Sequence, residues 1–125
     1  MDKYNHISIG YVCNVASYFL SKKLKSTKSV FDRIGTPMWA VKELFETDFK
    51  EMFLEENLKS DKLFTNDKKE SWYDEKYYIR FVYNKNYEVF KKIMEKRINI
   101  MKNELENWEE GKSKPILFIR CEEKD

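Results

Sequence analysis

The chain has 125 residues, 42% of them hydrophobic and 37% charged, which is the length and composition of one globular domain. Its 24 basic and 22 acidic residues leave a net charge of +2, too small for strong long-range attraction to nucleic acid or to an anionic membrane. Two cysteines at no metal-site spacing, and no apolar run near the roughly 18 residues of a membrane span, predict a soluble cytoplasmic protein without metal, cofactor, nucleic-acid or membrane partner.

The first predicted strand is the apolar run of residues 7–9, which Gly10 ends. An amphipathic stretch over residues 14–24 then predicts a helix. Cys13 therefore lies at the turn between them, where unpaired backbone N–H groups and the positive end of the helix dipole favour a thiolate. A reactive thiol is one interpretation. The other is a small buried apolar side chain, which is the commoner state of a free cysteine.

A second helix is predicted from the run Gly35, Thr36 and Pro37. Thr36 suits the N-cap, and Pro37 suits the first helical position because it has no N–H to leave unsatisfied. Four apolar residues share one face at helical spacing, namely Pro37, Val41, Leu44 and Phe45. Asp48 is then expected to cap a short helical turn over residues 49–53.

The middle of the chain predicts a small β-hairpin or irregular excursion, followed by a strand. Residues 62–65 and 71–73 read as two short strands on either side of residues 66–69. Residues 77–83 are rich in aromatic and β-branched side chains that alternate in the manner of a strand, and residues 84–86 form the following turn.

Residues 87–108 predict a long helix, because seven apolar residues recur at three- and four-residue steps: Tyr87, Phe90, Met94, Ile98, Met101, Leu105 and Trp108. Gly111 is expected to end it. Residues 116–119 are continuously apolar, as in a strand of a parallel sheet that is covered on both faces.

These elements predict an α/β fold: a layered domain with a mainly parallel central sheet, a small β-hairpin excursion and a long amphipathic helix. We expect a single domain over residues 1–125. Because a buried strand over residues 116–119 needs neighbours on both sides, and few parallel ones are predicted, the domain is expected to be either minimal or truncated at its C-terminal end.

Four segments in order resemble one known family: residues 7–16, 31–40, 77–81 and 116–120. They are similar to the pattern of the putative papain-like cysteine peptidase family, also classed as a domain of unknown function. That pattern has a Ser-Leu-Gly-x-x-Cys opening, a Phe-Asp segment ending in Ile-Gly-Thr, an aromatic strand with a histidine near its end, a long charged helix and a final strand ending in arginine. The resemblance spans most of the chain.

The resemblance implies a nucleophilic Cys13 with a histidine base, because a thiol attacking a carbonyl needs a group that holds its proton. The chain departs from the pattern where histidine and aspartate are expected, since Tyr83 and Asn84 stand there. Tyrosine has an unperturbed pKa of about 10 and is a poor proton acceptor at neutral pH. His6, the one histidine, is expected at the surface and roughly 15 Å or more from Cys13, at the opposite end of the first strand.

Other polar residues are candidates for the same cleft. Asn14 and the N–H groups around Cys13 could form an oxyanion hole. Asp32 and Arg33 are expected near the carboxyl edge of the sheet, where open α/β sheets bind ligands, although a structural ion pair is the alternative. Arg120 at the end of the last strand could bind a carboxylate or phosphate through its guanidinium, or make a structural ion pair.

Two functions therefore remain open. One is a thiol-dependent hydrolase or acyl transferase, with Cys13 as nucleophile and a base supplied by Tyr83, by water or by residues outside this chain. The other is a degenerate, non-catalytic member that binds a peptide or a small acyl or carbohydrate ligand in the same cleft. The absence of a well-placed histidine favours the second.

Overall fold

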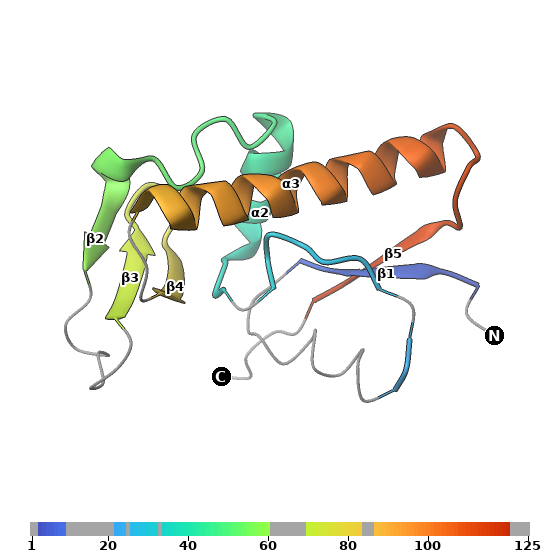
Figure 1. Cartoon of the computed structure of the whole chain (residues 1–125), viewed down its shortest axis with the longest axis horizontal. Coiled ribbons are helices and arrows are strands. Elements are labelled where there is room, and N and C mark those ends of the chain that lie inside the picture. Colours follow the sequence, from blue (N-terminus) through green and yellow to red (C-terminus); the bar gives the residue numbers. More distant parts are fainter. Residues whose placement is uncertain are drawn as a thin grey trace.

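Two small β-sheets and two helices make up the described part of the chain (Figure 1). The structure is a computed structural model that describes residues 3–9, 22–24, 26–32, 34–60, 70–83 and 87–120. Its elements in chain order are β1 (Asn5–Ser8), α2 (Met38–Glu46), the 3₁₀ turn η1 (Glu55–Asn57), β2 (Leu58–Ser60), β3 (Glu70–Asp74), β4 (Ile79–Tyr83), α3 (Tyr87–Glu109) and β5 (Ile116–Ile119). The predicted mixture of helices and strands in an α/β fold is confirmed.

Strands β1 and β5, from opposite ends of the chain, form a parallel pair (Figure 1). Their register runs from Asn5 opposite Ile116 to Ser8 opposite Ile119. On its other side β1 is joined to residues 26–27, because the N–H of Thr27 donates to the carbonyl of His6 over 3.0 Å. The parallel pairing predicted for residues 116–119 is therefore confirmed, and β1 has a neighbour on each side.

The second sheet is antiparallel, in the order β2-β3-β4. Strand β3 pairs with β4 from Glu70 opposite Tyr83 to Asp74 opposite Ile79, so the strand predicted at residues 77–83 is confirmed from residue 79 onward. The expected strand at residues 62–65 lies outside the described residues, as do most of the predicted helix of residues 14–24 and the turn of residues 84–86. On the side away from β4, β3 pairs with β2 (Leu58–Ser60) within the described residues.

Helix α3 spans both sheets (Figure 1). Near its start, the ring of Phe90 stacks on that of Phe81 in β4 at 4.6 Å between centroids. Near its end, Glu104 accepts a hydrogen bond from the side-chain amide of Asn5 in β1 over 2.9 Å. The predicted long helix and its apolar stripe are confirmed, since four of the stripe's residues are buried: Phe90, Met94, Ile98 and Met101. The two sheets therefore share one core through α3.

The expected capping of α2 by Thr36 is wrong by one position. Pro37 is the N-cap, in an extended conformation, and no side chain caps the helix. Gly35 explains the shift, because it pairs with Arg80 through hydrogen bonds of 2.8 and 2.9 Å in both directions, which keeps the chain extended into the start of the helix. The predicted apolar face is confirmed by the burial of Val41 and Leu44.

Residues 47–53 do not form the helical turn expected after Asp48. They form irregular turns in which Asp48, Phe49 and Phe53 have positive φ angles of 58, 60 and 59°. Left-handed backbone is unfavourable for residues with a Cβ atom, so burial of the side chains must offset its cost. Phe49 and Phe53 are indeed buried, together with Met52, as their apolar character predicted.

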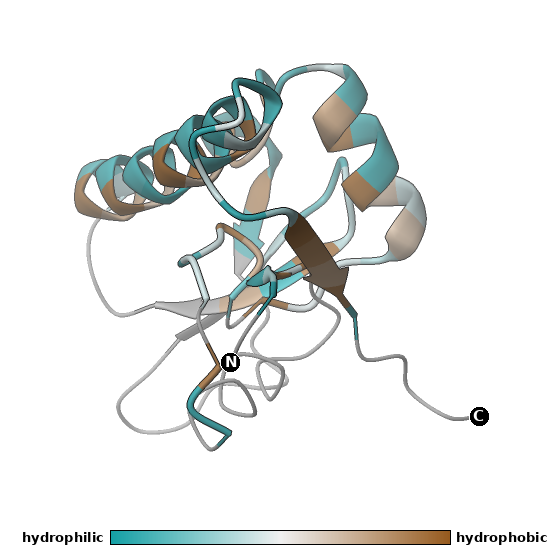
Figure 2. Ribbon diagram, turned by 90° about the vertical axis from the view of Figure 1, so that its right-hand side faces the viewer, coloured by the Kyte–Doolittle hydropathy of each residue, from teal (hydrophilic) through white to brown (hydrophobic). Residues whose placement is uncertain are grey.

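Strand β5 is less covered than its sequence suggests. Leu117 is 40% exposed and Phe118 is 37% exposed, whereas a strand covered on both faces was expected. Figure 2 shows β5 as the dark brown strand, in keeping with its continuous run of apolar residues. A continuous apolar run indicates a strand but does not establish how many layers cover it.

Candidate functional site

The carboxyl ends of β1 and β5 lie at one edge of the parallel pair, as parallel strands require. The N–H of Ile9 donates to the carbonyl of Ile119 over 3.0 Å, which continues the pairing one residue beyond β1. The Nη1 atom of Arg120 then donates to the carbonyl oxygen of Ile9 over 3.1 Å. Arg120 is half-buried at this carboxyl edge, where the sequence predicted it, and it contacts the segment that leads in sequence towards Cys13.

Three of the predicted site residues, Cys13, Asn14 and Arg33, lie outside the described residues, and so does Cys121. Their proposed roles as nucleophile, oxyanion-hole donor and ligand contact therefore stay predictions. Of the predicted site residues, the structure describes Asp32, Arg120 and the backbone of Tyr83.

Asp32 closes a tight turn. Its Oδ2 accepts a hydrogen bond from the N–H of Ser29 over 3.2 Å, and its own N–H donates to the carbonyl of Ser29 over 3.2 Å. The Ser29 hydroxyl in turn accepts from the N–H of Phe31 over 3.0 Å. This turn holds Val30 and Phe31 fully buried, so at least one oxygen of the Asp32 carboxylate has a structural role.

Tyr83, the residue at the position of the expected histidine, is the last residue of β4. Its Cα partner is Glu70 in β3, so it belongs to the antiparallel sheet, whereas Arg120 follows a strand of the parallel pair. The segment of residues 31–40 contacts the antiparallel sheet as well, because Gly35 pairs with Arg80 in β4. Motifs that carry the family resemblance thus pair within each sheet, although they are far apart in sequence.

The expectation that His6 is a surface residue is wrong. His6 is only 7% exposed, and all four residues of β1 are buried. The physical reason is that β1 has Leu117 of β5 opposite His6 on one side and Ser26 bridged to it on the other. A polar residue close to the start of a chain suggests exposure, but a strand flanked on both sides has no open edge.

Asn5 and Asp74 are among the buried polar side chains that were missed in the sequence. The Nδ2 atom of Asn5 donates to the hydroxyl of Thr27 over 2.6 Å and to Glu104 over 2.9 Å, which ties β1 to α3. No sequence signal marks it. Asp74 is the other, and its position at the head of the turn between β3 and β4 is a recognisable signal for a side chain that bonds the backbone ahead of it.

Asp74 is fully buried and holds the backbone of two segments. Its Oδ2 accepts from the N–H of Phe53 over 2.9 Å and its Oδ1 from the N–H of Lys76 over 3.0 Å. Burial raises the pKa of Asp74, while N–H donors from Phe53, Lys76 and Tyr77 act in the opposite direction. Phe53 has left-handed backbone, so the bond from its N–H to Asp74 stabilises an otherwise unfavourable conformation.

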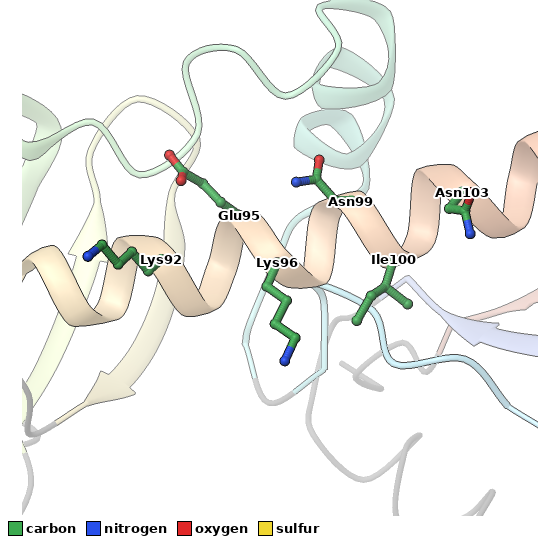
Figure 3. A pocket seen from close by; sticks show the side chains of 6 residues that line it. All are labelled: Lys92, Glu95, Lys96, Asn99, Ile100 and Asn103. Atoms are coloured by element: carbon green, nitrogen blue, oxygen red, sulfur yellow. The ribbon is translucent and has the colours of Figure 1, made fainter.

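A hollow lies along the outer side of α3 (Figure 3). Its lining side chains all come from this helix: Lys92, Glu95, Lys96, Asn99, Ile100 and Asn103. They include no thiol or imidazole, so this hollow has none of the groups that the cysteine chemistry needs.

Within the described ranges, no three His, Cys, Asp or Glu side chains group in a way that could hold a metal ion. Of the helices in those ranges, none has the length and apolar character needed to cross a membrane.

Comparison with known proteins gives one match. The model of a family described as "Putative papain-like cysteine peptidase (DUF1796)" matches residues 4–125, which is nearly the whole chain. Neither the curated proteins nor the solved structures include a significant match.

Proposed function

Because this chain belongs to the putative papain-like cysteine peptidase family, we propose that it retains the family's cleft, marked by Cys13, and uses it to bind a ligand without cleaving it. The proposal depends on the position of histidine. The chain's one histidine is His6, which is buried inside β1, and the residue at the end of β4 is Tyr83.

The chemical argument follows from what a thiol needs. Cys13 has to transfer its proton to a base before it attacks a carbonyl, and a second transfer protonates the leaving group. A tyrosine of ordinary pKa, about 10, does not take a proton from a thiol of pKa about 8.5 at neutral pH. His6 is enclosed by the neighbours of β1, which limits the approach of a substrate to its ring.

The ligand class follows from the groups at the carboxyl edge of the parallel pair. The guanidinium of Arg120, which donates to the carbonyl of Ile9, is a planar cation of the kind that binds carboxylates, so the ligand class that we propose for this edge is a carboxylate-bearing peptide or a small acyl or carbohydrate ligand. Asp32 and Arg33 would line the same cleft, with Asn14 contributing a polar contact next to Cys13.

A thiol-reactivity experiment tests the absence of a base. Cys13 and Cys121 are alkylated with iodoacetamide at pH 7, and the modified peptides are quantified by mass spectrometry over time. We expect Cys13 to react slowly, at the rate of an ordinary thiol, because no imidazole holds its thiolate. The variant Tyr83→His should accelerate alkylation of Cys13, and the matched control Tyr83→Phe should not.

Turnover and binding complete the test. Wild-type protein that hydrolyses a peptide or acyl ester, with loss of turnover in Cys13→Ala, would overturn the proposal in favour of a thiol hydrolase. A ligand selected by thermal shift from a set of dipeptides, acyl esters and sugars should bind Cys13→Ala and wild type alike. Arg120→Ala should weaken that binding, and unchanged affinity would remove Arg120 from the site.

A further inference from the structure

Strand β5 has one backbone edge that β1 does not use. The N–H of Asn5 donates to the carbonyl of Pro115, and the N–H of Ile9 donates to the carbonyl of Ile119. In a parallel ladder, alternate residues of a strand face the same neighbour, so the hydrogen-bonding groups of residues 115, 117 and 119 point towards β1. The N–H and C=O groups of Ile116 and Phe118 therefore point to the opposite side, where the described residues supply no further strand.

The side chains of this edge lack the features that keep natural edge strands unpaired. Such strands carry charged residues, prolines or bulges within them, whereas β5 reads Ile-Leu-Phe-Ile and is regular. Leu117 is 40% exposed and Phe118 is 37% exposed, and consecutive residues of a strand point to opposite faces. Leu117 on one face and Phe118 on the other, whose ring centroid lies 6.2 Å from that of Phe45, thus offer partly exposed apolar surface beside a backbone edge that no strand of the described residues uses.

We propose that the outer edge of β5 binds an extended, apolar peptide segment by strand addition. The backbone groups of Ile116 and Phe118 supply hydrogen bonds two residues apart, which is the repeat of an extended peptide. Leu117 and Phe118 contact the peptide's side chains above and below the sheet. The peptide is uncharged where it pairs, because β5 itself carries no charged side chain.

The size of the edge favours a short peptide over a second copy of this chain. A strand of four residues is about 13 Å long, and a strip of that length buries far less than the roughly 800 Å² per partner of a stable protein interface. A peptide needs only the strip itself. The inference is independent of the proposed function, since it uses no atom of Cys13 or Arg120.

The probe is an end-capped hexapeptide of alternating valine and threonine, titrated to about 1 mM into ¹⁵N-labelled protein while amide shifts are followed by NMR. Saturable shifts are expected at residues 116–119. A twin peptide with an N-methyl group on every residue has the same side chains but no backbone N–H on either edge, so its binding should be at least roughly tenfold weaker. Equal binding of the two peptides, or no shift at residues 116–119, would overturn the proposal.

Variants of β5 locate the contact. Phe118→Pro removes an N–H that faces outward and leaves the ladder to β1 intact, so peptide binding should fall at least roughly tenfold. Should this variant fail to fold, Leu117→Lys places a charge on the exposed face of β5, beside the outer edge. It should weaken peptide binding, whereas Leu117→Val should not. The variant Cys13→Ala should bind the peptide as wild type does, whatever its effect on the cleft. Concentration-dependent dimerisation in sedimentation experiments that Leu117→Lys abolishes would assign the edge to a second copy and overturn the peptide proposal.

Discussion

Arg120 and Ile9 lie 111 positions apart in the sequence, and the guanidinium of Arg120 donates a hydrogen bond to the carbonyl oxygen of Ile9 over 3.1 Å. The bond connects the ends of β5 and β1 at the carboxyl edge of the parallel pair. It also fixes the backbone just before Gly10, from which the chain continues to Cys13. The arginine that ends the last family motif thus has a structural partner in the first one.

Replacing Arg120 should therefore destabilise the parallel pair. Arg120→Met keeps much of the apolar stem but removes the donor, and we expect a loss of about 1.5–3 kcal/mol in the free energy of unfolding, as for hydrogen bonds that involve a charged group. Arg120→Lys keeps the positive charge but lacks the planar guanidinium. Its free energy of unfolding should therefore lie between those of Arg120→Met and wild type. Urea unfolding followed by circular dichroism measures both. Wild-type stability in Arg120→Met would show that the bond to Ile9 contributes nothing.

Two tyrosines provide a matched pair of deletions. The hydroxyl of Tyr87 donates to the carbonyl of Phe53 over 2.9 Å, whereas the buried hydroxyl of Tyr77, which has Thr47 as a neighbour, makes no hydrogen bond of normal geometry among the described residues. Tyr87→Phe should lower the free energy of unfolding by about 1 kcal/mol. Tyr77→Phe removes the same atom but relieves an unsatisfied polar group, so its stability should equal or exceed that of wild type. Chemical denaturation of the two variants in parallel checks the contrast, and equal losses would contradict it.

The buried carboxyl of Asp74 should make stability depend on pH. Burial raises the pKa of Asp74 in the folded state above 3.8, the usual value, which the unfolded state keeps. At a pH between the unfolded-state pKa and the folded-state pKa, the folded state therefore binds more protons than the unfolded state. Stability from this group is present below pH 3.8 and is lost as pH rises through the folded-state pKa.

The variant Asp74→Asn isolates that contribution. It leaves one of the N–H groups of Phe53 and Lys76 facing an amide nitrogen, which should cost about 1–3 kcal/mol. The stability difference between wild type and Asp74→Asn should shrink as pH rises, in urea titrations at several pH values. A difference that stays constant or grows with pH would mean that the backbone donors outweigh burial.

Gly111 tests backbone conformation alone. Its φ angle is +74°, and a Cβ atom added there would meet nothing within 4 Å. Gly111→Ala should therefore cost about 1 kcal/mol through left-handed strain without any steric contact. Gly111→Asn should cost less, because asparagine tolerates this region better. Thermal unfolding of the two variants gives the comparison, and an alanine variant as stable as wild type would indicate that α3 ends equally well in another conformation.

Local sequence patterns were sufficient to predict those helices and strands whose formation depends mainly on residues close together in the sequence. The three- and four-residue spacing of apolar side chains predicts α3, because such spacing places them on one face of a helix whatever the rest of the chain does. The same holds for the aromatic alternation of β4 and for the apolar run of β5, whose parallel pairing was also anticipated. The order of the four motifs along the chain likewise sufficed to indicate the family.

Other features required the folded chain. Thr36 is not a cap because Gly35 pairs with a strand 45 positions away, and residues 48 and 49 adopt left-handed backbone because Phe49 gains burial by doing so. His6 is buried because neighbours from two distant segments flank β1. Of the predicted site, the position of Arg120 could be anticipated, whereas its partner Ile9 and the structural use of Asp32 could not.

The amino-acid sequence by itself determined that α3 is a helix with one apolar face and that β4 and β5 are strands, because those properties arise from residues within a few positions of one another. Only the tertiary structure decided which strand stays at an open edge, which polar groups are buried and which carbonyl Arg120 binds. Those outcomes depend on contacts between segments that are distant along the chain, and no local pattern encodes the identity of such a partner.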